Sequence, residues 1–170
     1  MTSDCVESVA AWLREITKDK LFFTNRQSAE EPDDPYGPIS VYPFSLPTFR
    51  EAQKKVPYII VQPVSGTDIL APGEDVQSSI MTRLIMAFYN PKDDEQEGAR
   101  VLQEMIDFLR VEIVRRCVIP DWKRHVPLYS VDLFQGITWD DFHEDTRPYT
   151  VGWIEMTWNL QPVQREVPFI

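Results

Sequence analysis

Apolar and polar residues alternate along this chain with two different periods, and each change of period marks the boundary of an element. From residue 4 to 18 the apolar residues recur three or four positions apart, which is the period of a helix. Ser3 and Asp4 lie at the start of this stripe, and either side chain can cap a first helical turn. The stripe consists of Val6, Val9, Ala10, Leu13 and Ile16. The pattern therefore predicts an amphipathic helix over residues 4 to 18.

Two segments with the strand period follow in the middle of the chain. Residues 56 to 64, VPYIIVQPV, are rich in β-branched and aromatic side chains, and Pro63 favours a sheet edge or a strand end. Residues 76 to 90, VQSSIMTRLIMAFYN, carry apolar side chains on both faces, which is typical of a central strand. One face comprises Ile80, Leu84, Met86 and Phe88, and the other comprises Met81, Ile85, Ala87 and Tyr89. The stretch between the two strands, SGTDILAPGED, is predicted to be a loop.

The helical period returns between residues 90 and 117. Acidic residues open this segment and two arginines close it, which is the charge order that a helix dipole favours, and Pro120 ends it. Its apolar stripe consists of Leu102, Met105, Ile106, Leu109, Ile113 and Cys117. Strands are then predicted at residues 126 to 134 and 150 to 161, with GITWDDFHED between them as a loop or irregular strand. The fold class that follows is α+β, a mostly antiparallel four-stranded sheet with two helices packed on it, in the order α-β-β-α-β-β.

Residues 19 to 55 follow neither period. Gly37 and the acidic run AEEPDD interrupt them, together with the prolines at positions 32, 35, 38, 43 and 47. A connection of this length without regular structure is uncommon unless it has a function, and only ISVYPF suggests a short extended piece. We therefore expect one domain over residues 1 to 170 with a Pro-rich irregular excursion at about 19 to 55, a candidate interaction arm.

The last predicted strand divides its aromatic residues between two faces. Its inner set is Ile154, Met156, Trp158 and Leu160, and its outer set is Val151, Trp153, Glu155, Thr157 and Asn159. Trp158 is thus predicted to belong to the core. Trp153 lies on a partly polar face, where it is either covered by a loop or the long arm, or contacts another subunit. Trp139, Arg147 and Tyr149 lie close in sequence, and because Trp, Tyr and Arg are enriched at interfaces, these four residues form a candidate subunit interface.

Composition restricts the function further. With 43% hydrophobic and 26% charged residues, the chain has the profile of a globular domain. Its formal net charge of −10 argues against binding to the phosphate backbone of a nucleic acid, so sequence-specific nucleic acid binding is not expected. The acidic, helical N-terminus and the absence of any long apolar run predict neither a signal peptide nor a membrane span, and hence a soluble protein.

The sequence contains few groups arranged for chemistry. The glycines are too scattered to cradle phosphate, and Ser65 lacks the glycine two positions before it that a nucleophile elbow requires. Cys5 and Cys117 lack CxxC spacing and are predicted to be reduced, packed thiols. The strongest cluster is DDFHED, in which Asp140, Asp141, His143, Glu144 and Asp145 could ligate a hard metal ion. Because no second ligand pair accompanies it, we predict no metal site there, and no motif in the chain indicates a cofactor. A small acidic metal-dependent enzyme that uses this cluster is the rival hypothesis.

Two segments resemble a family of tailed-bacteriophage proteins, the tail terminators or tail-completion proteins. The first runs from VPYIIVQPVSGTD through SSIMTRLIMAFYNPKDDEQEGARVLQEMIDFLR, and the second is RPYTVGWIEMTWNLQP. Together they span about residues 56 to 162, and the first helix agrees by position. The proline-rich segment from 19 to 55 departs from the more compact members of the family.

This resemblance implies a structural virion protein without catalytic residues. A member of the family forms a closed ring, commonly a homohexamer, that caps the tail tube, ends its elongation and joins the tail to the head connector. Its partners are then other copies of itself, the major tail tube protein and the head-tail connector protein. Its location is the head-proximal end of the virion tail, after assembly in the host cytoplasm. Two further hypotheses are a neck or head-completion protein of the same joint, and a carbohydrate- or peptide-binding module using Trp139, Tyr149 and Trp153.

Overall fold

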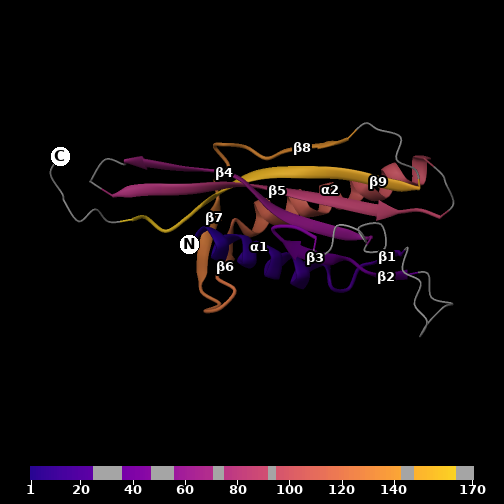
Figure 1. The fold of residues 1–170 in the computed structure, drawn as a ribbon, viewed down its shortest axis with the longest axis horizontal. Coiled ribbons are helices and arrows are strands. Elements are labelled where there is room, and N and C mark those ends of the chain that lie inside the picture. Colours follow the sequence, from indigo (N-terminus) through magenta and orange to yellow (C-terminus); the bar gives the residue numbers. More distant parts are fainter. Residues whose placement is uncertain (25–35, 47–55, 71–74, 92–94, 143–147, 164–170) are drawn as a thin grey trace.

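The computed structural model describes residues 1–24, 36–46, 56–70, 75–91, 95–142 and 148–163. Within these ranges the chain forms an α+β fold (Figure 1). The elements are α1 (Thr2–Thr17), β1 (Leu21–Phe23), β2 (Tyr36–Pro38), β3 (Ser40–Pro43), β4 (Tyr58–Leu70), β5 (Val76–Tyr89), α2 (Glu95–Arg116), β6 (Val118–Pro120), β7 (Pro127–Val131), β8 (Thr138–Asp141) and β9 (Tyr149–Asn159). Both predicted helices and the central position of β5 are confirmed.

The predicted four-stranded sheet is wrong. In the described part of the chain, seven strands form a mixed sheet that curls into a half-barrel, in the order β3-β4-β5-β9-β7-β6, with β8 also paired to β9. Strand β3 runs parallel to β4, and the other neighbours are antiparallel. The predicted strands correspond to β4, β5, β7 and β9. The order of elements also differs, because five strands rather than two lie between the helices and four follow the second helix.

Much of the difference between the predicted and the observed sheet arises in residues 19 to 55, which were predicted to be irregular. Strands β1 and β2 pair with each other as a separate two-stranded sheet, and β3 extends the main sheet beyond β4. Ile39 and Val41 bury their side chains in the core, which accounts for the order of this proline-rich stretch. Pro38 and Pro43 each end a strand, where the missing N–H removes no ladder hydrogen bond that the sheet needs. Residues 25–35 and 47–55 of the excursion lie outside the described ranges.

Both helices cover the inner face of the half-barrel. α1 packs against β3, β4 and β6, and α2 packs against β5 and β9. The approach of α2 to β9 depends on Gly152, since a Cβ atom at that position would lie 3.0 Å from both terminal methyl groups of Leu102. The strand side chains beneath the helices are almost fully buried. On β5 and β9 they are Ile80, Thr82, Leu84, Met86, Phe88, Ile154, Met156 and Trp158.

Trp158 lies in the core, as predicted, with 1% of its surface exposed. Its indole Nε1–H donates a hydrogen bond to Oγ1 of Thr82 at 3.0 Å, and the Thr82 hydroxyl lies 3.2 Å from Sδ of Met156, to which it donates. This places a polar pair inside an otherwise apolar layer. Because every donor in the group has an acceptor, the core carries the indole N–H without a desolvation penalty.

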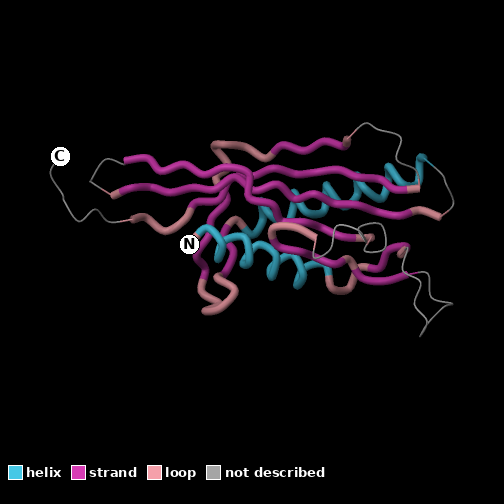
Figure 2. The backbone as a smooth tube through the Cα atoms, viewed as in Figure 1, coloured by secondary structure: helices cyan, strands magenta, loops and turns pink. Residues whose placement is uncertain are grey.

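The β4–β5 hairpin extends beyond the helices. Figures 1 and 2 show its two strands running out to the left past the N-terminal end of α1. The residues from Ser65 to Leu70 were predicted to be a loop, but they continue β4 and pair with β5 as far as Leu70 opposite Val76. A bulge between Pro63 and Ser65 separates this outer part from the part beneath the helices. We call Val64–Leu70 and Val76–Ser79 the hairpin arm.

Candidate interaction surfaces

The outer face of β5 and β9 carries the aromatic residue whose role the sequence leaves open. Side chains alternate along both strands, and most of those on the face opposite the core are only partly buried, although Ala87 and Thr157 are buried there. Trp153 lies on this outer face, opposite Ile85 of β5 on one side and Asp140 of β8 on the other. Within the described ranges, α1 and α2 pack on the other face, and Trp153 is partly exposed, so this part of the structure leaves the outer face open to a partner.

A charged pair adjoins Trp153. The Nε atom of Arg83 donates to Oε1 of Glu155 at 2.7 Å, and the Arg83 guanidinium lies 5.8 Å from the centre of the Trp153 ring. The Arg83 side chain is 36% exposed and that of Glu155 is 19% exposed, so solvent screens the pair and it contributes only about 1 kcal/mol. The ion pair of Arg83 and Glu155 therefore adds little to the stability of the fold.

The four predicted interface residues do not form one patch. Tyr149 lies on the same face of β9 as Trp153 and contacts Tyr89, with 5.6 Å between the ring centres. Trp139 pairs with Ile154, a core residue, and therefore points to the helix side of the sheet. There the guanidinium of Arg110, from α2, lies 3.7 Å from its ring centre. Arg147 falls in a gap between the described ranges.

This division also bears on the hypothesis of an aromatic binding module. Such a module would require Trp139, Tyr149 and Trp153 to line one site. Since Trp139 occupies the opposite face from the other two, no single ligand surface includes all three side chains.

The predicted acidic cluster is described only in part. Asp140 and Asp141 are successive residues of β8, so their carboxylates leave the strand on opposite faces. Residues 143 to 145, which would supply the imidazole and the other acids, belong to a segment that the structure does not describe. Among the residues that it does describe, no group of three or more potential ligands is placed to hold a metal ion.

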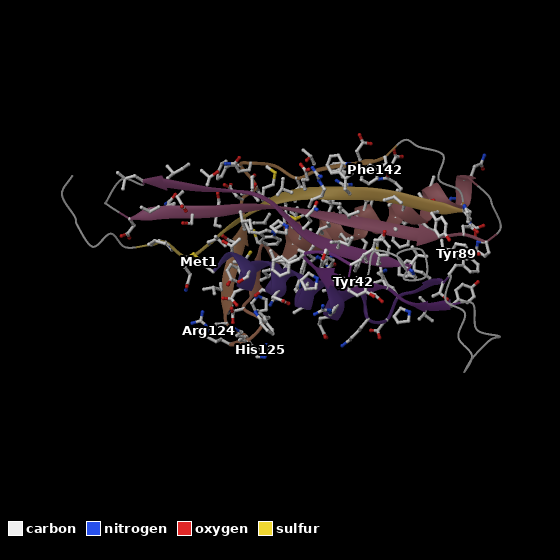
Figure 3. The ribbon with its side chains drawn as sticks, in the orientation of Figure 1. Met1, Tyr42, Tyr89, Arg124, His125 and Phe142 are labelled. Atoms are coloured by element: carbon white, nitrogen blue, oxygen red, sulfur yellow. The ribbon has the colours of Figure 1, made fainter. Side chains whose placement is uncertain are left out.

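The loop between β6 and β7 is fixed by a buried carboxylate. Oδ1 of Asp121, a residue that is 3% exposed, accepts hydrogen bonds from the backbone N–H groups of Arg124 at 2.9 Å and Lys123 at 3.0 Å. These hydrogen bonds, that of Arg124 first, hold the pKa of Asp121 below its ordinary value. The N–H of Trp122 donates to the Ser8 hydroxyl at 3.0 Å, which ties the loop to α1. Arg124 itself is labelled at the outer end of the loop in Figure 3.

The hairpin arm is the surface that the sequence prediction missed. Residues 64 to 70 are all exposed, including Val64 at 42%, Ile69 at 60% and Leu70 at 57%. Strand β3 pairs with β4 only from Tyr58 to Val61, so the outer edge of the arm has no strand partner within the described ranges. Two adjacent aliphatic residues in the polar stretch SGTDILAPGED were the available signal, but Gly66 and Asp68 argued against a strand.

An aromatic pocket lies at the other end of β5. It has a volume of about 230 Å³ and is formed where β1 and β2 pack over the end of β5 and the start of α2. Phe22 packs against Phe88 with ring centres 5.2 Å apart, and Phe23 stacks on Tyr36 at 4.6 Å. The lining residues are Leu21, Phe22, Phe23, Tyr36, Phe88, Tyr89, Asn90, Glu97, Gly98, Val101 and Thr150.

No protein-family model matches the chain, and no curated protein matches it. No helix in the described ranges is long and apolar enough to cross a bilayer.

Proposed function

We propose that this chain is a structural virion protein, a ring-forming tail terminator that caps the tail tube, ends its elongation and joins the tail to the head connector. Two segments of the chain resemble that family. Within the structure they form β4, β5 and most of α2, and then β9. They therefore make up the centre of the sheet and the hairpin arm, the parts that offer surfaces to a partner.

The observation that carries the proposal is the open edge of the hairpin arm. Seven successive residues of β4, from Val64 to Leu70, are exposed, and three of them are aliphatic. An exposed strand edge with apolar side chains pairs readily with another chain, and proteins that act alone usually protect such edges with charge, proline or covering loops. The hairpin arm as defined contains no proline, and Asp68 is its one charged residue. The edge thus has the character of an assembly surface.

A ring also requires two different surfaces on each subunit. Heterologous contacts, in which one patch meets a different patch of the neighbour, close into rings when the rotation between subunits is right. The hairpin arm and the outer face around Trp153 are distinct surfaces of one sheet, so the fold offers more than one site for such contacts. The net charge of −10 suits a channel that DNA must traverse without adhering.

The proposed partners follow from this role. Copies of the chain form the ring, expected to be a hexamer from the resemblance. The major tail tube protein contacts one side of the ring and the connector protein contacts the other, at the head-proximal end of the tail. No cofactor, metal or membrane takes part in the proposal.

Removal of the gene from the phage that carries it tests this function. Loss of a terminator produces tails of uncontrolled length, which electron microscopy of the lysate measures directly. Tails of normal length that fail to join heads would instead indicate a neck or head-completion protein. A lysate with normal, joined virions would overturn both. Supplying the intact gene from a plasmid is the control, and it should restore the normal length distribution.

A further inference from the structure

The hairpin arm and the aromatic pocket are two apolar features at opposite ends of the same strand. Val76, where β5 begins, pairs with Leu70 in the arm, while Phe88 and Tyr89, where β5 ends, line the pocket. Figure 3 labels Tyr89 at the far end of the molecule from the hairpin. At a rise of about 3.3 Å per residue, the 13 steps from Val76 to Tyr89 span about 43 Å.

This separation excludes the arm of the same chain as the occupant of the pocket. A nearly straight strand cannot fold back to bring its two ends together, so the arm cannot reach the pocket of its own chain. A second copy of the chain can supply the arm, because both features are present on every molecule. The contact would be heterologous, with one end of each molecule meeting the opposite end of the next, which is the arrangement that a closed ring requires.

The chemistry of the two features is complementary. Ile69 and Leu70 of the arm are 60% and 57% exposed, although both are aliphatic. The pocket is walled by the rings of Phe22, Phe23 and Tyr36 and has a volume of about 230 Å³. An apolar cavity of roughly 150 Å³ accommodates benzene, so this pocket has room for one branched aliphatic side chain. The open backbone edge of β4 lies beside these side chains, and an added edge strand binds through its main chain while single side chains fill pockets.

We infer that the hairpin arm of one copy docks at the aromatic pocket of the next copy, with an aliphatic side chain of the arm filling the pocket. This inference rests on the proposed function, because it assigns the subunit contact of the proposed ring. Leu21 is 66% exposed at the mouth of the pocket and contacts the incoming arm. The outer face around Trp153 stays available for the tail tube or the connector.

Exposed residues on each feature allow variants that fold. Ile69→Ser with Leu70→Ser removes the apolar side chains of the arm, and Leu21→Asp places a carboxylate at the mouth of the pocket. Each variant should weaken association between copies about tenfold or more, measured by sedimentation velocity over a concentration series. Thermal unfolding of the monomer should be unchanged. Thr67→Ala with Gln77→Ala, polar positions on the same arm, is the matched control and should associate like the wild type.

Mixing the two variants tests the head-to-tail geometry. The arm variant keeps an intact pocket, and the pocket variant keeps an intact arm. Equal amounts of both should therefore form a heterodimer that grows no further, because the remaining arm and pocket of that dimer are both defective. Two variants that associate like the wild type, or a mixture that stays monomeric, would overturn the inference.

The same experiment separates this inference from the proposed function. If both variants form the same rings as the wild type, the arm-to-pocket contact is refuted and the proposed terminator role is not affected. If the copies assemble through the arm but deletion of the gene leaves the tails normal, the arm-to-pocket contact is supported and the terminator role is refuted. A wild-type protein that stays monomeric at all concentrations, alone and with tail tube protein, would remove both.

Discussion

The buried pair of Thr82 and Trp158 gives a sharp test of how the core is built. Thr82 is fully buried, and its hydroxyl accepts the Trp158 indole N–H at 3.0 Å and lies 3.2 Å from the Met156 sulfur. Thr82→Val keeps the shape of the side chain and removes this acceptor. The indole N–H then stays in the core with no hydrogen-bond partner.

The size of the effect follows from that unpaired donor. A buried polar group left without a partner costs about 1–3 kcal/mol, and the added methyl group of valine recovers only part of it. We expect Thr82→Val to lower the free energy of unfolding by about 1–2 kcal/mol. Trp158→Phe removes the donor but leaves space in the core, at a cost of about 1–3 kcal/mol. The double variant should be more stable than the sum predicts, by about 1 kcal/mol, since it contains no unpaired donor.

Urea unfolding followed by far-ultraviolet circular dichroism measures these differences. The protein concentration must be equal in all samples, because association raises the apparent stability. Thr157→Val is the matched control: Thr157 is 6% exposed on the outer face of β9, and none of its described contacts is a side-chain hydrogen bond, so no donor loses a partner. A Thr82→Val variant as stable as the wild type, or strictly additive costs in the double variant, would refute the account of the core.

Three further predictions concern single side chains. Backbone hydrogen bonds lower the pKa of Asp121 in the folded protein from its ordinary value of 3.8. The carboxylate therefore stabilises the fold fully above pH 3.8, and this contribution is lost as the pH falls from 3.8 through the lower pKa of the folded state. Asp121→Asn should flatten the acid side of a plot of melting temperature against pH. Burial raises the pKa of Cys5 to about 12, so a thiol reagent should label the partly exposed Cys117 in the native protein and both thiols only in urea. Trp153→Ala should cost about 1–2 kcal/mol in chemical denaturation, against about 3–5 kcal/mol for Trp158→Ala, since part of the Trp153 ring already faces solvent; equal costs would place Trp153 in the core.

The sequence predicted the long elements because their periodicity is set by burial. β5 and α2 each have a buried face that repeats over many residues, so local pattern and tertiary packing agree. The same reasoning placed Trp158 in the core from its spacing relative to Ile154 and Met156. These are the cases in which each residue's environment depends mostly on its own strand or helix.

The sequence failed where structure depends on other segments. β6 is three residues long and ends at Pro120, and all four residues of β8 are exposed, so neither strand has a burial pattern of its own. β3 is ordered by its parallel pairing with β4, which no local signal indicates. Trp139 and Trp153 are 14 positions apart, yet they lie on opposite faces because β8 pairs with β9 in one particular register. The aromatic pocket likewise forms from β1, β2, β5, α2 and β9 together.

Self-assembly of the purified protein tests the central claim most directly. Size-exclusion chromatography coupled to light scattering measures the number of copies in the assembly, and negative-stain images show how the copies are arranged. We expect closed rings of uniform size at high protein concentration, or on the ends of tail tubes when tail tube protein is present. A particle that remains one 19.8 kDa chain at every concentration, with no ring beside tail tube protein, would contradict the proposed role.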